Sequence, residues 1–503
     1  MPNGAERLRA DLRSQLETLV PDVGEPGQAY QTDTYWLGQL RRARGQPLGA
    51  PDLVVRPTTV EQVSAVLRLA HREGIPVVPW GAGSGSQGGA VAIHGGILVD
   101  TRGLDRLIEI DERSMTATVQ AGMMNDAFEA ALNERGLTYP HYPASTAIAT
   151  VGGYAACRGS GVLSTKYGKI EDILLSLQLV LPDGRVIRTL PVPRHAVGPD
   201  LTQLFTGSEG TFGIITEMTV RVQHLPEARS FHAIQFDDIH QGIEAGRCII
   251  QAGIRPAVMR LYDQVAAGGS LGQVIGQTLD RPTMVLLFEG PAALAKAEAE
   301  VALPLARERG ARSIDSVVAE HWWEHRYDFY SPPHMPQLPM MWGTIEIVGL
   351  YRDVDAIYDA LRSELPRRYE RANLRLAIHL SHWYEWGTML YGRFTMPEAP
   401  TDLDKAAQLH DGIWADAIDI ALAHGGVMND HHGVGLKLAP FMRRQYGDAF
   451  SVLEAIKEAI DRRGIMNPGK LGFGNTTAES RGGTHKGMPP TGWTSSREEE
   501  ARR

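Results

Sequence analysis

The stretch "VVPWGAGSGSQGGAVAIHGGILVD", residues 77–100, carries the first strong fold signal of the chain. Gly83, Gly85 and Gly88 spell G-x-G-x-x-G, which in a dinucleotide-binding Rossmann turn follows a strand and opens directly into a helix. A short buried strand is predicted just before the glycines. The residues after Gly88 are broken by further glycines and become β-like at 97–100, so no helix fits there. We therefore expect a phosphate-cradling glycine loop, but not a Rossmann turn.

A helix is predicted immediately before this stretch, over residues 58–74. Thr58 and Glu61 have the spacing of a capping box, and Gly74 is a natural residue to follow the helix end. Asn125 is placed to cap the next helix along the chain. These patterns predict regular helices on both sides of the glycine loop.

Two further segments rich in glycine and small residues lie in the first half, at 144–161 and 207–213. Together with 81–89 they allow close backbone approach to a flat or anionic group. Tight turns within a small-residue β domain are the alternative explanation. Three such segments, each beside a predicted strand, favour a bound nucleotide-like cofactor.

Length, charge and cysteine content restrict the class of protein. The chain has 503 residues, which exceeds one ordinary core, and its formal net charge of −9 argues against a nucleic-acid partner. Its two cysteines, Cys157 and Cys248, form no disulfide framework and suit a reducing compartment, so we expect a cytoplasmic protein. No apolar run is long enough for a transmembrane segment.

The glycine-rich segments carry a family resemblance. The motifs are "PVVPWGAGSGSQGG", "YPASTAIATVGGYAACRGSGVLSTKYGKIEDILLSLQLVLPDGRVI", "DLTQLFTGSEGTFGIITE" and "GIMNPGKL", in that order. On these motifs the chain resembles the FAD-linked oxidases of the vanillyl-alcohol oxidase type, also called PCMH-type flavoproteins. The resemblance covers about residues 40 to 474.

The resemblance implies an α+β fold, with a PCMH-type FAD-binding domain of two α/β subdomains and an α+β cap domain over the flavin ring. The expected divisions are a helical N-terminal extension at 1–45, the FAD-binding domain at 46–226, the cap or substrate domain at 227–448, a segment at 449–474 that returns to the FAD domain, and a disordered tail at 475–503.

The resemblance also implies which residues hold FAD. The expected set is Gly81, Ala82, Gly83, Ser84, Gly85, Pro143, Ala144, Ser145, Thr146, Gly152, Gly153, Ser160, Gly161, Glu209, Gly210, Thr211 and Ile215. Some relatives tether their flavin through a histidine in the pyrophosphate loop. Ser84 stands at that position here, so we expect the flavin to be bound non-covalently.

Two branches of the family are similar to this chain and imply different reactions. The D-2-hydroxy-acid dehydrogenases imply oxidation of an alcohol or 2-hydroxy acid, with hydride passing to the flavin N5 and the electron acceptor left open. The alkyldihydroxyacetonephosphate synthases imply a net non-redox, flavin-dependent reaction of ether-lipid synthesis. We expect the first reaction and keep the second as the alternative. Both imply a small-molecule substrate, and a homodimer is common among such relatives.

Candidate catalytic residues come from the second half of the chain. Tyr391, His431, His432 and Arg260 match synthase positions, but the first of that branch's three consecutive histidines is Asp430 here. A histidine suits base work, and a neighbouring aspartate could orient it. The guanidinium could hold a carboxylate or phosphate, or stabilise reduced flavin. Ordinary packing and a surface salt bridge are the alternatives for the tyrosine and the arginine.

Two sequence patterns typical of metal sites bear on the predicted chemistry. The H-x-G-D-G-N-x-H pattern of the dehydrogenase branch is absent from residues 379–392, where His382 matches a family histidine, so no metal is expected there. "HWWEH", from His321 to His325, is a literal H-x-x-E-H zinc-peptidase signature with Glu324 inside it. The motif is short in a chain with 17 histidines, and its aromatic surroundings favour packing or a substrate pocket, with Arg326 as an anion contact. A non-catalytic flavin-binding module is the remaining alternative.

Overall fold

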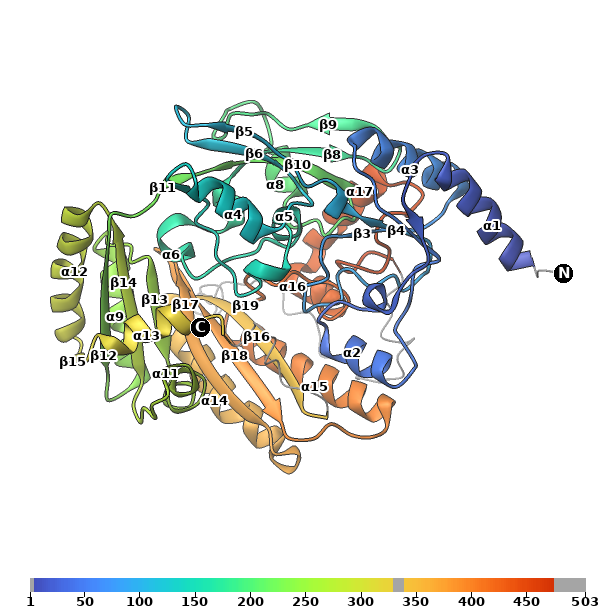
Figure 1. Cartoon of the computed structure of the whole chain (residues 1–503). Coiled ribbons are helices and arrows are strands. Elements are labelled where there is room, and N and C mark those ends of the chain that lie inside the picture. The colour runs from blue at the N-terminus through green and yellow to red at the C-terminus, as the bar shows by residue number, and fades with distance from the viewer. Residues whose placement is uncertain (1–3, 329–338, 475–503) are drawn as a thin grey trace, which may run out of the picture.

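The computed structural model describes residues 4–328 and 339–474 of the chain. Helices and strands are mixed along its whole length, which confirms the α+β class. Figure 1 shows the first half of the chain, in blue to green, at the top and right, above a large sheet built from the second half. The predicted tail at 475–503 lies outside the described residues. The division into five parts stays a prediction.

The first sheet contains the strand that precedes the glycine loop. Its order is β1 (Val23–Gly24), β2 (Leu53–Val55), β4 (Ile97–Asp100) and β3 (Val77–Trp80). Strands β2 and β3 pair with β4 in parallel. Helices α1 (Gly4–Glu17) and α3 (Val60–Glu73) share the apolar core of this sheet, whereas α2 (Trp36–Ala43) packs against the second half of the chain. Residues 81–96 form turns and bends, which confirms that no Rossmann helix follows the glycines.

The second sheet is antiparallel, and the other two glycine-rich segments lie in connections between its strands. Its order is β5 (Leu107–Asp111), β6 (Thr116–Gln120), β10 (Ile214–Arg221), β8 (Leu174–Val180) and β9 (Val186–Arg188). A Pro-Asp-Gly turn at residues 182–184 joins β8 to β9. Short helices and one small strand pair complete this part: α4 (Asn125–Asn133), α5 (Val151–Cys157), α6 (Ser164–Tyr167), α7 (Ile170–Ile173), α8 (Leu201–Phe205), β7 (Leu137–Thr138) and β11 (Gln223–His224).

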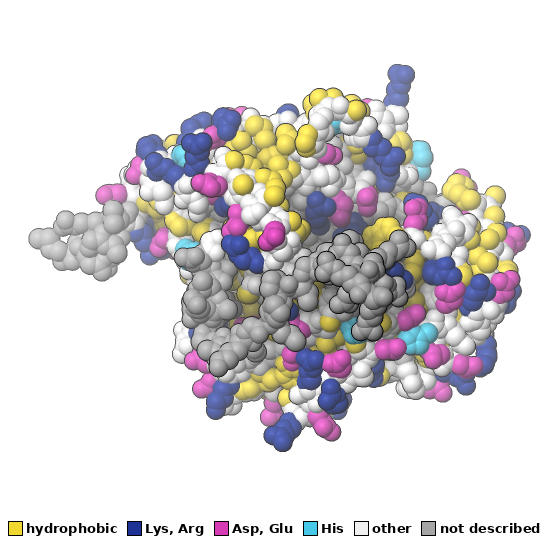
Figure 2. All heavy atoms as spheres, turned by 180° about the vertical axis from the view of Figure 1, so that it is seen from behind, with side chains coloured by type: hydrophobic (Ala, Val, Ile, Leu, Met, Phe, Trp, Pro, Cys, Tyr) yellow, Lys and Arg dark blue, Asp and Glu magenta, His cyan; other side chains and the backbone are white. Residues whose placement is uncertain are grey.

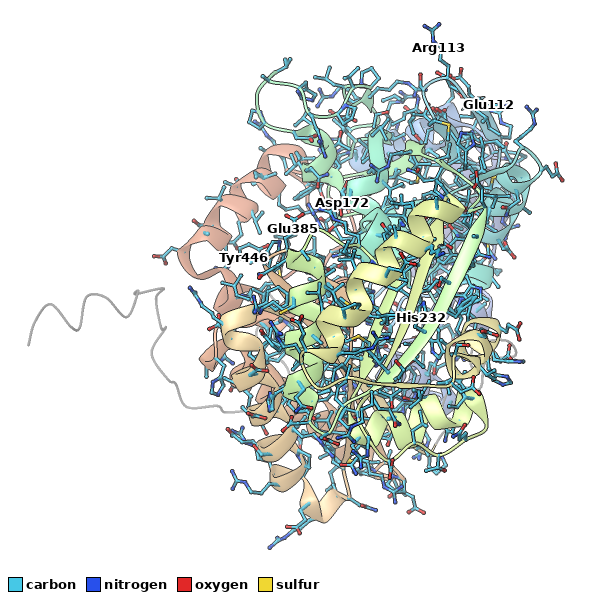
Figure 3. All side chains as sticks on the ribbon, turned by 90° about the vertical axis from the view of Figure 1, so that its left-hand side faces the viewer. Glu112, Arg113, Asp172, His232, Glu385 and Tyr446 are labelled. Atoms are coloured by element: carbon cyan, nitrogen blue, oxygen red, sulfur yellow. The ribbon has the colours of Figure 1, made fainter. Side chains whose placement is uncertain are left out.

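The second half builds an eight-stranded antiparallel sheet. Its order is β15 (Arg312–Ile314), β12 (Ala228–Gln235), β14 (Thr283–Gly290), β13 (Val258–Tyr262), β17 (Arg375–Trp383), β18 (Gly387–Met396), β16 (Met341–Leu350) and β19 (Val427–Met428). One face, which we call the outer face, carries α9 (Ile239–Gln251), α12 (Ala292–Arg307), α14 (Tyr351–Arg368) and α15 (Leu403–Ala423). Figure 3 looks towards this side, with His232 of β12 labelled beside α12.

The opposite face of this sheet, the inner face, is turned towards the first half of the chain. Part of it is covered by α10 (Gln264–Ala266), α11 (Gly272–Ile275) and α13 (Val317–His325). The main apolar core fills the space between the outer face and its helices and extends through the second sheet of the first half, and a smaller core lies around α13. On the surface shown in Figure 2, positive and negative side chains are interspersed.

The C-terminal segment packs against the first sheet. It contains α16 (Met442–Tyr446) and α17 (Phe450–Ile460), after which Met466 forms a parallel bridge with Val77. Asn467 Nδ2 donates to Gly89 O at 2.9 Å, and Lys470 Nζ donates to Val91 O at 2.8 Å. Residues far apart in sequence therefore fix the end of the glycine loop together.

Two predicted helix caps are wrong. The helix after residue 58 is capped by Thr59, whose Oγ1 accepts from Gln62 N at 3.3 Å, although the predicted Gly74 does follow the helix end, with φ of 69°. Asn125 does not cap α4, because its side chain turns into the core and Nδ2 donates to His141 O at 3.4 Å. The first error arises because Thr58 and Thr59 offer similar local patterns, and the second because a tertiary contact takes up the Asn125 side chain.

Candidate active site

A cavity of about 640 Å³ lies between the glycine-rich segments and the inner face of the large sheet. The first half lines it with residues 79–87, 89–90, 143–145, 148–150, 152–154, 156–157, 159–162, 209–210 and 213–215. The second half lines it with polar and aromatic side chains, among them Arg260, Tyr262, Thr344, His379, Ser381, His382, Tyr391, Arg393, His431 and His432. Segments that are distant in the sequence thus line one cavity.

Most residues predicted to hold a cofactor line this cavity. They are Gly81, Ala82, Gly83, Ser84, Gly85, Pro143, Ala144, Ser145, Gly152, Gly153, Ser160, Gly161, Glu209, Gly210 and Ile215. Thr146 and Thr211 do not line it. Thr211 is fully buried and donates to Ser208 O at 2.7 Å, and Thr146 donates to Pro143 O at 2.6 Å. These two hydroxyls shape their own turns.

The glycine loop presents backbone donors to the cavity. No hydrogen bond to an acceptor in residues 4–328 or 339–474 is made by the N–H groups of residues 82–87. The Gly85 carbonyl of the loop, in contrast, has a hydrogen-bond partner, since Gly85 O accepts from Thr34 N at 2.8 Å. The Ser86 hydroxyl and the Gln87 amide are buried and also lack partners within the described chain. A loop with unsatisfied N–H groups is suited to an anion such as a diphosphate.

Two other glycines are explained by the packing of the chain itself. A Cβ at Gly152 would lie 2.5 Å from Ala121 Cβ, and one at Gly161 would lie 2.6 Å from the backbone of Tyr142. Helix α5 also runs through the small-residue segment, although no apolar periodicity there predicts a helix. Close packing of the chain against itself therefore accounts for part of the glycine content, and cofactor binding does not explain all of it.

The inner face of the sheet obtains its polar side chains from strand alternation. On β17, Ile378 and Leu380 point into the main core, whereas His379 and Ser381 line the cavity. The same alternation places on the cavity side Arg260 and Tyr262 of β13, Thr344 of β16, and Tyr391 and Arg393 of β18. Pairing of β17 with β18 shifts register after Leu380, and this irregularity brings His382 to the cavity as well.

Three adjacent strands bring Glu346, Tyr391 and His379 side by side. Tyr391 is the register partner of both others. The rings of His379 and Tyr391 stack at 4.6 Å between centroids. Arg260 Nη2 lies 2.7 Å from His379 Nε2. Sequence reasoning missed His379 and Glu346, although polar residues that alternate with apolar ones in these strands were a usable signal.

Residues 429–437, which we call the histidine loop, bring two more imidazoles to Tyr391. The ring centroids of His431 and His432 lie 6.0 and 5.8 Å from that of Tyr391. His432 Nδ1 lies 2.9 Å from the fully buried Glu346 Oε1. Asn429, with φ of 67°, starts the turn and accepts from His432 N at 3.2 Å. The predicted catalytic residues Tyr391, His431, His432 and Arg260 are thus brought together.

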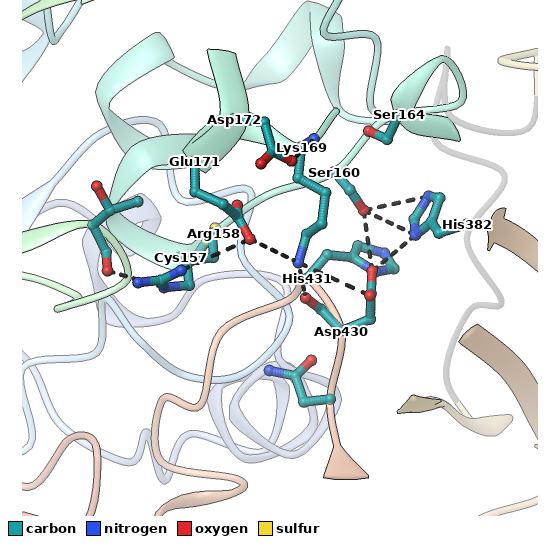
Figure 4. Close-up of polar contacts among 12 residues, drawn as sticks. Cys157, Arg158, Ser160, Ser164, Lys169, Glu171, Asp172, His382, Asp430 and His431 are labelled. Atoms are coloured by element: carbon teal, nitrogen blue, oxygen red, sulfur yellow. Dashed lines mark hydrogen bonds and ion pairs between the residues drawn. The ribbon is translucent and has the colours of Figure 1, made fainter. Parts of the chain in front are cut away.

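Asp430 is the centre of a buried polar cluster, drawn in Figure 4. Its Oδ2 lies 2.8 Å from His382 Nδ1 and 3.0 Å from His431 Nδ1. Ser160 Oγ donates to the same oxygen at 3.3 Å. Lys169 Nζ donates to the Asp430 carbonyl at 2.5 Å. The residue that departs from the synthase pattern therefore holds two histidines and two first-half segments in place.

Burial and these partners set the charges of the site. Burial, then His432, lowers the pKa of His431 to about 3, and burial, then Arg260, holds the pKa of His379 well below its usual range. Burial raises the pKa of Asp430, but Lys169 and His382 outweigh it and hold that pKa well below its usual range. His431 is therefore neutral near pH 7, and with Nδ1 donating to Asp430 its Nε2 remains an acceptor.

Arg260 is a cation with aromatic rather than acidic neighbours. Its Cζ lies 5.4 Å from the ring centroid of Tyr262 and 5.9 Å from that of Trp322. It forms no ion pair with a carboxylate anywhere in the described ranges, and its Nε is buried without a partner there. A guanidinium in this state is suited to bind an anionic group.

The zinc-peptidase motif lies on α13, but its histidines do not join a metal-like group. The ring centroids of His321 and His325 are 4.3 Å apart, and Trp322 between them is buried. Arg326 packs over the Trp323 ring at 3.6 Å and lines the cavity. Within the described chain, one group has ligand atoms within 4.8 Å of one another, and it consists of His382, Asp430 and His431. The expectation of no metal stays a prediction.

Two protein families match most of the chain. Residues 51–190 match the "FAD binding domain" family, and residues 225–471 match "FAD linked oxidases, C-terminal domain". FAD-linked oxidoreductase YgcU of Escherichia coli O157:H7 is 32% identical over 84% of this chain and 89% of its own. Alkyldihydroxyacetonephosphate synthase of Trypanosoma brucei brucei is 29% identical over 88% and 77%. Glycolate oxidase subunit GlcD of Bacillus subtilis is 27% identical over 84% and 89%.

Solved structures show the same fold. An alkyldihydroxyacetonephosphate synthase superposes with a TM-score of 0.76 over 91% of this chain and 84% of its own, at 24% identity. A p-cresol methylhydroxylase with bound substrate gives 0.72 over 94% and 98%, at 18% identity. These matches confirm the PCMH-type fold. Within the described residues, no helix is both long and apolar enough to cross a bilayer.

Proposed function

The chain belongs to the FAD-linked oxidase family, and we propose that it is an FAD-dependent oxidoreductase that oxidises an alcohol or a 2-hydroxy acid. One observation carries the proposal. A single cavity is lined on one side by the glycine-rich segments and on the other by Tyr391, His431, His432 and Arg260. Relatives named for glycolate and D-lactate support the substrate class.

The residues of the cavity fit the cofactor that the family uses. The N–H groups of residues 82–87, which have no acceptor among the described residues, suit the pyrophosphate, and the cavity continues from them to the inner face of the sheet. Bound FAD supplies a two-electron acceptor for hydride. The loop from Gly81 to Gly89 contains no histidine, cysteine or tyrosine, so we propose that the flavin is held without a covalent bond.

The proton of the substrate hydroxyl needs a base, and His432 with Tyr391 is the proposed pair. His432 Nδ1 faces the Glu346 carboxylate at 2.9 Å. Burial raises the pKa of Glu346, but His432 outweighs this and lowers it, so the carboxylate stays ionised. An ionised partner stabilises the imidazolium that forms when His432 takes a proton. Arg260 is placed to hold a substrate carboxylate.

Steady-state oxidation of a panel of alcohols and 2-hydroxy acids, with an artificial dye as electron acceptor, tests the activity. In the Tyr391→Phe variant we expect wild-type flavin content and turnover slower by about 100-fold or more, because only the hydroxyl is removed. Wild-type turnover in this variant would exclude Tyr391 from the reaction. A loss of flavin instead would show that the tyrosine has a structural role.

A second candidate function is a net non-redox reaction like that of the alkyldihydroxyacetonephosphate synthases. It is favoured by the Trypanosoma relative, which is 29% identical over 88% of this chain. Asp430 argues against this second function. Its carboxylate replaces the first of the three consecutive histidines of the synthases, and it is hydrogen-bonded to His382 and His431. A flavoprotein that no alcohol or hydroxy acid reduces would favour this second candidate.

A further inference from the structure

Glu209 joins the cofactor side of the cavity to the histidine loop. Its carboxylate accepts hydrogen bonds from Val434 N and, at 2.8 Å, from Gly435 N. Glu209 lies in the glycine-rich 207–213 turn of the first half, 225 residues before Val434. One side chain from the cofactor side therefore satisfies two consecutive backbone donors just after His431 and His432.

A second anchor comes from the glycine loop. Gln87 O accepts from Leu436 N at 2.8 Å and from Lys437 N at 3.1 Å. Four successive N–H groups of the histidine loop, at residues 434–437, are thus bound by two residues that line the cavity from the first half. Residues 434–437 are therefore fastened to the proposed flavin cradle, whereas the start of the loop is held by the sheet, since Asn429 N donates to Glu346 O at 2.6 Å.

Two glycines of the histidine loop allow Glu209 and Gln87 to come this close to its backbone. A Cβ at Gly433 would lie 2.7 Å from Glu209 Oε1, and a Cβ at Gly435 would lie 2.2 Å from Gln87 O. In the sequence "HHGVG", residues 431–435, the glycines therefore stand at the positions that Glu209 and Gln87 approach most closely. A side chain at either position would force the loop or its anchor to shift.

Glu209 itself combines an unfavourable backbone conformation with a buried carboxyl group. Its φ is 49°, in the left-handed region that non-glycine residues rarely occupy. Burial raises the pKa of its carboxyl to about 7, although Val434 N, Gly435 N and Lys470 favour the ionised form and Asp33 opposes it. Backbone strain combined with a buried carboxyl persists where a fixed geometry is needed.

We propose that Glu209 is a positioning residue that anchors the histidine loop to the cofactor cradle and so sets where His431 and His432 meet the substrate. The proposal rests on the proposed function for its catalytic consequence. Its structural part, the fastening of residues 433–437, does not depend on which substrate is oxidised.

The test replaces Glu209 with glutamine, which is nearly isosteric but has only one acceptor oxygen and no charge. Glu217→Gln is the matched control, because Glu217 lies on β10 next to the same turn and pairs with Arg188 at 2.6 Å instead. In Glu209→Gln holoenzyme we expect faster amide exchange in peptides covering 433–437, with unchanged exchange in β10 and unchanged flavin content. The control is expected to match wild type in the loop.

Kinetics supply the second readout. Glu209→Gln is expected to lower kcat by about tenfold or more with little change in KM, because the histidines act on the transition state and Arg260 is not on this loop. Unchanged loop exchange with loss of flavin would overturn the proposal, since Glu209 would then be a cofactor ligand. Unchanged exchange with wild-type kcat would also overturn it. If no substrate is oxidised at all, the exchange result still decides whether the anchor exists.

A variant that fails to fold would not leave the proposal untested. Glu209→Asp keeps the charge but is too short to reach both donors, so loop exchange is expected to rise in it as well. Exchange at the wild-type rate in a folded Glu209→Asp protein would contradict the anchor.

Discussion

At the scale of single residues, the site pairs imidazoles with carboxylates. His432 faces Glu346, and His431 faces Asp430, so each histidine has an acid at Nδ1. The two pairs differ in surroundings, because Asp430 also binds His382 while Glu346 has Tyr391 as its register partner. This arrangement favours His432 as the base and His431 as a fixed neutral neighbour.

The base assignment predicts the effect of His432→Gln. We expect turnover to fall by about 100- to 10,000-fold, since glutamine cannot accept the proton. Flavin content should not change. His224→Gln, an exposed histidine on β11, is the control and should behave like wild type. If His432→Gln turns over normally while Tyr391→Phe does not, the proton passes to the tyrosine instead.

His141 is a buried imidazole that makes the fold sensitive to acid. It is fully buried between Tyr139 and Tyr154, and neither ring nitrogen has a partner in the described chain. Burial, followed by the nearby His382, lowers its pKa to about 3. The unfolded chain binds the proton more tightly, so stability falls as the pH drops from 6.5 towards 3.

Replacing His141 by leucine should remove this part of the acid sensitivity. Between pH 7 and pH 5 the wild type should lose about 2 kcal/mol more unfolding free energy than His141→Leu, given an unfolded pKa near 6.5. Denaturant unfolding at the two pH values measures the difference. Parallel losses in both proteins would mean that His141 is not the titrating group.

At the scale of elements, the packing of the glycine loop decides which of its glycines can be replaced to test cofactor binding without disturbing the fold. Gly83 is a poor choice, because its φ is 69° and a Cβ would lie 2.3 Å from the Trp80 ring. Gly85 lines the cavity, and a Cβ there meets only Asp33 Oδ2, at 3.7 Å.

Gly85→Val should therefore fold and bind FAD at least about tenfold more weakly, because the side chain occupies the space of the anion. Gly27→Val is the control, since a Cβ at Gly27 has open space and this glycine is outside the cavity. Flavin per protein after purification is the measurement. A fully loaded, folded Gly85→Val protein would contradict the pyrophosphate assignment.

Elements with a strong local pattern could be predicted from the sequence. Helices α3, α12, α15 and α17, and the β8–β9 turn, follow from apolar spacing and turn residues. Helix α5 could not, because glycine and alanine give it no apolar stripe. The irregularity in β17 that turns His382 to the cavity depends on pairing with β18, which no local pattern encodes.

At the scale of the whole molecule, the sequence predicts the components of the site but not their geometry. The motifs identify the family, and Tyr391, His431, His432 and Arg260 could be predicted from resemblance. Their assembly requires three strands in register and a loop anchored by Glu209 and Gln87 across the chain. Such long-range contacts are set by tertiary packing, so Glu209 was predicted only as a cofactor residue.

The most direct test of the central claim is the visible spectrum of the purified protein under anaerobic conditions, before and after addition of single alcohols and 2-hydroxy acids. We predict an oxidised-flavin band that bleaches with one member of the panel, because hydride from that substrate reduces bound FAD. A flavin band that no compound bleaches would contradict the proposed oxidation. A colourless protein that FAD cannot reconstitute would contradict the cofactor assignment itself.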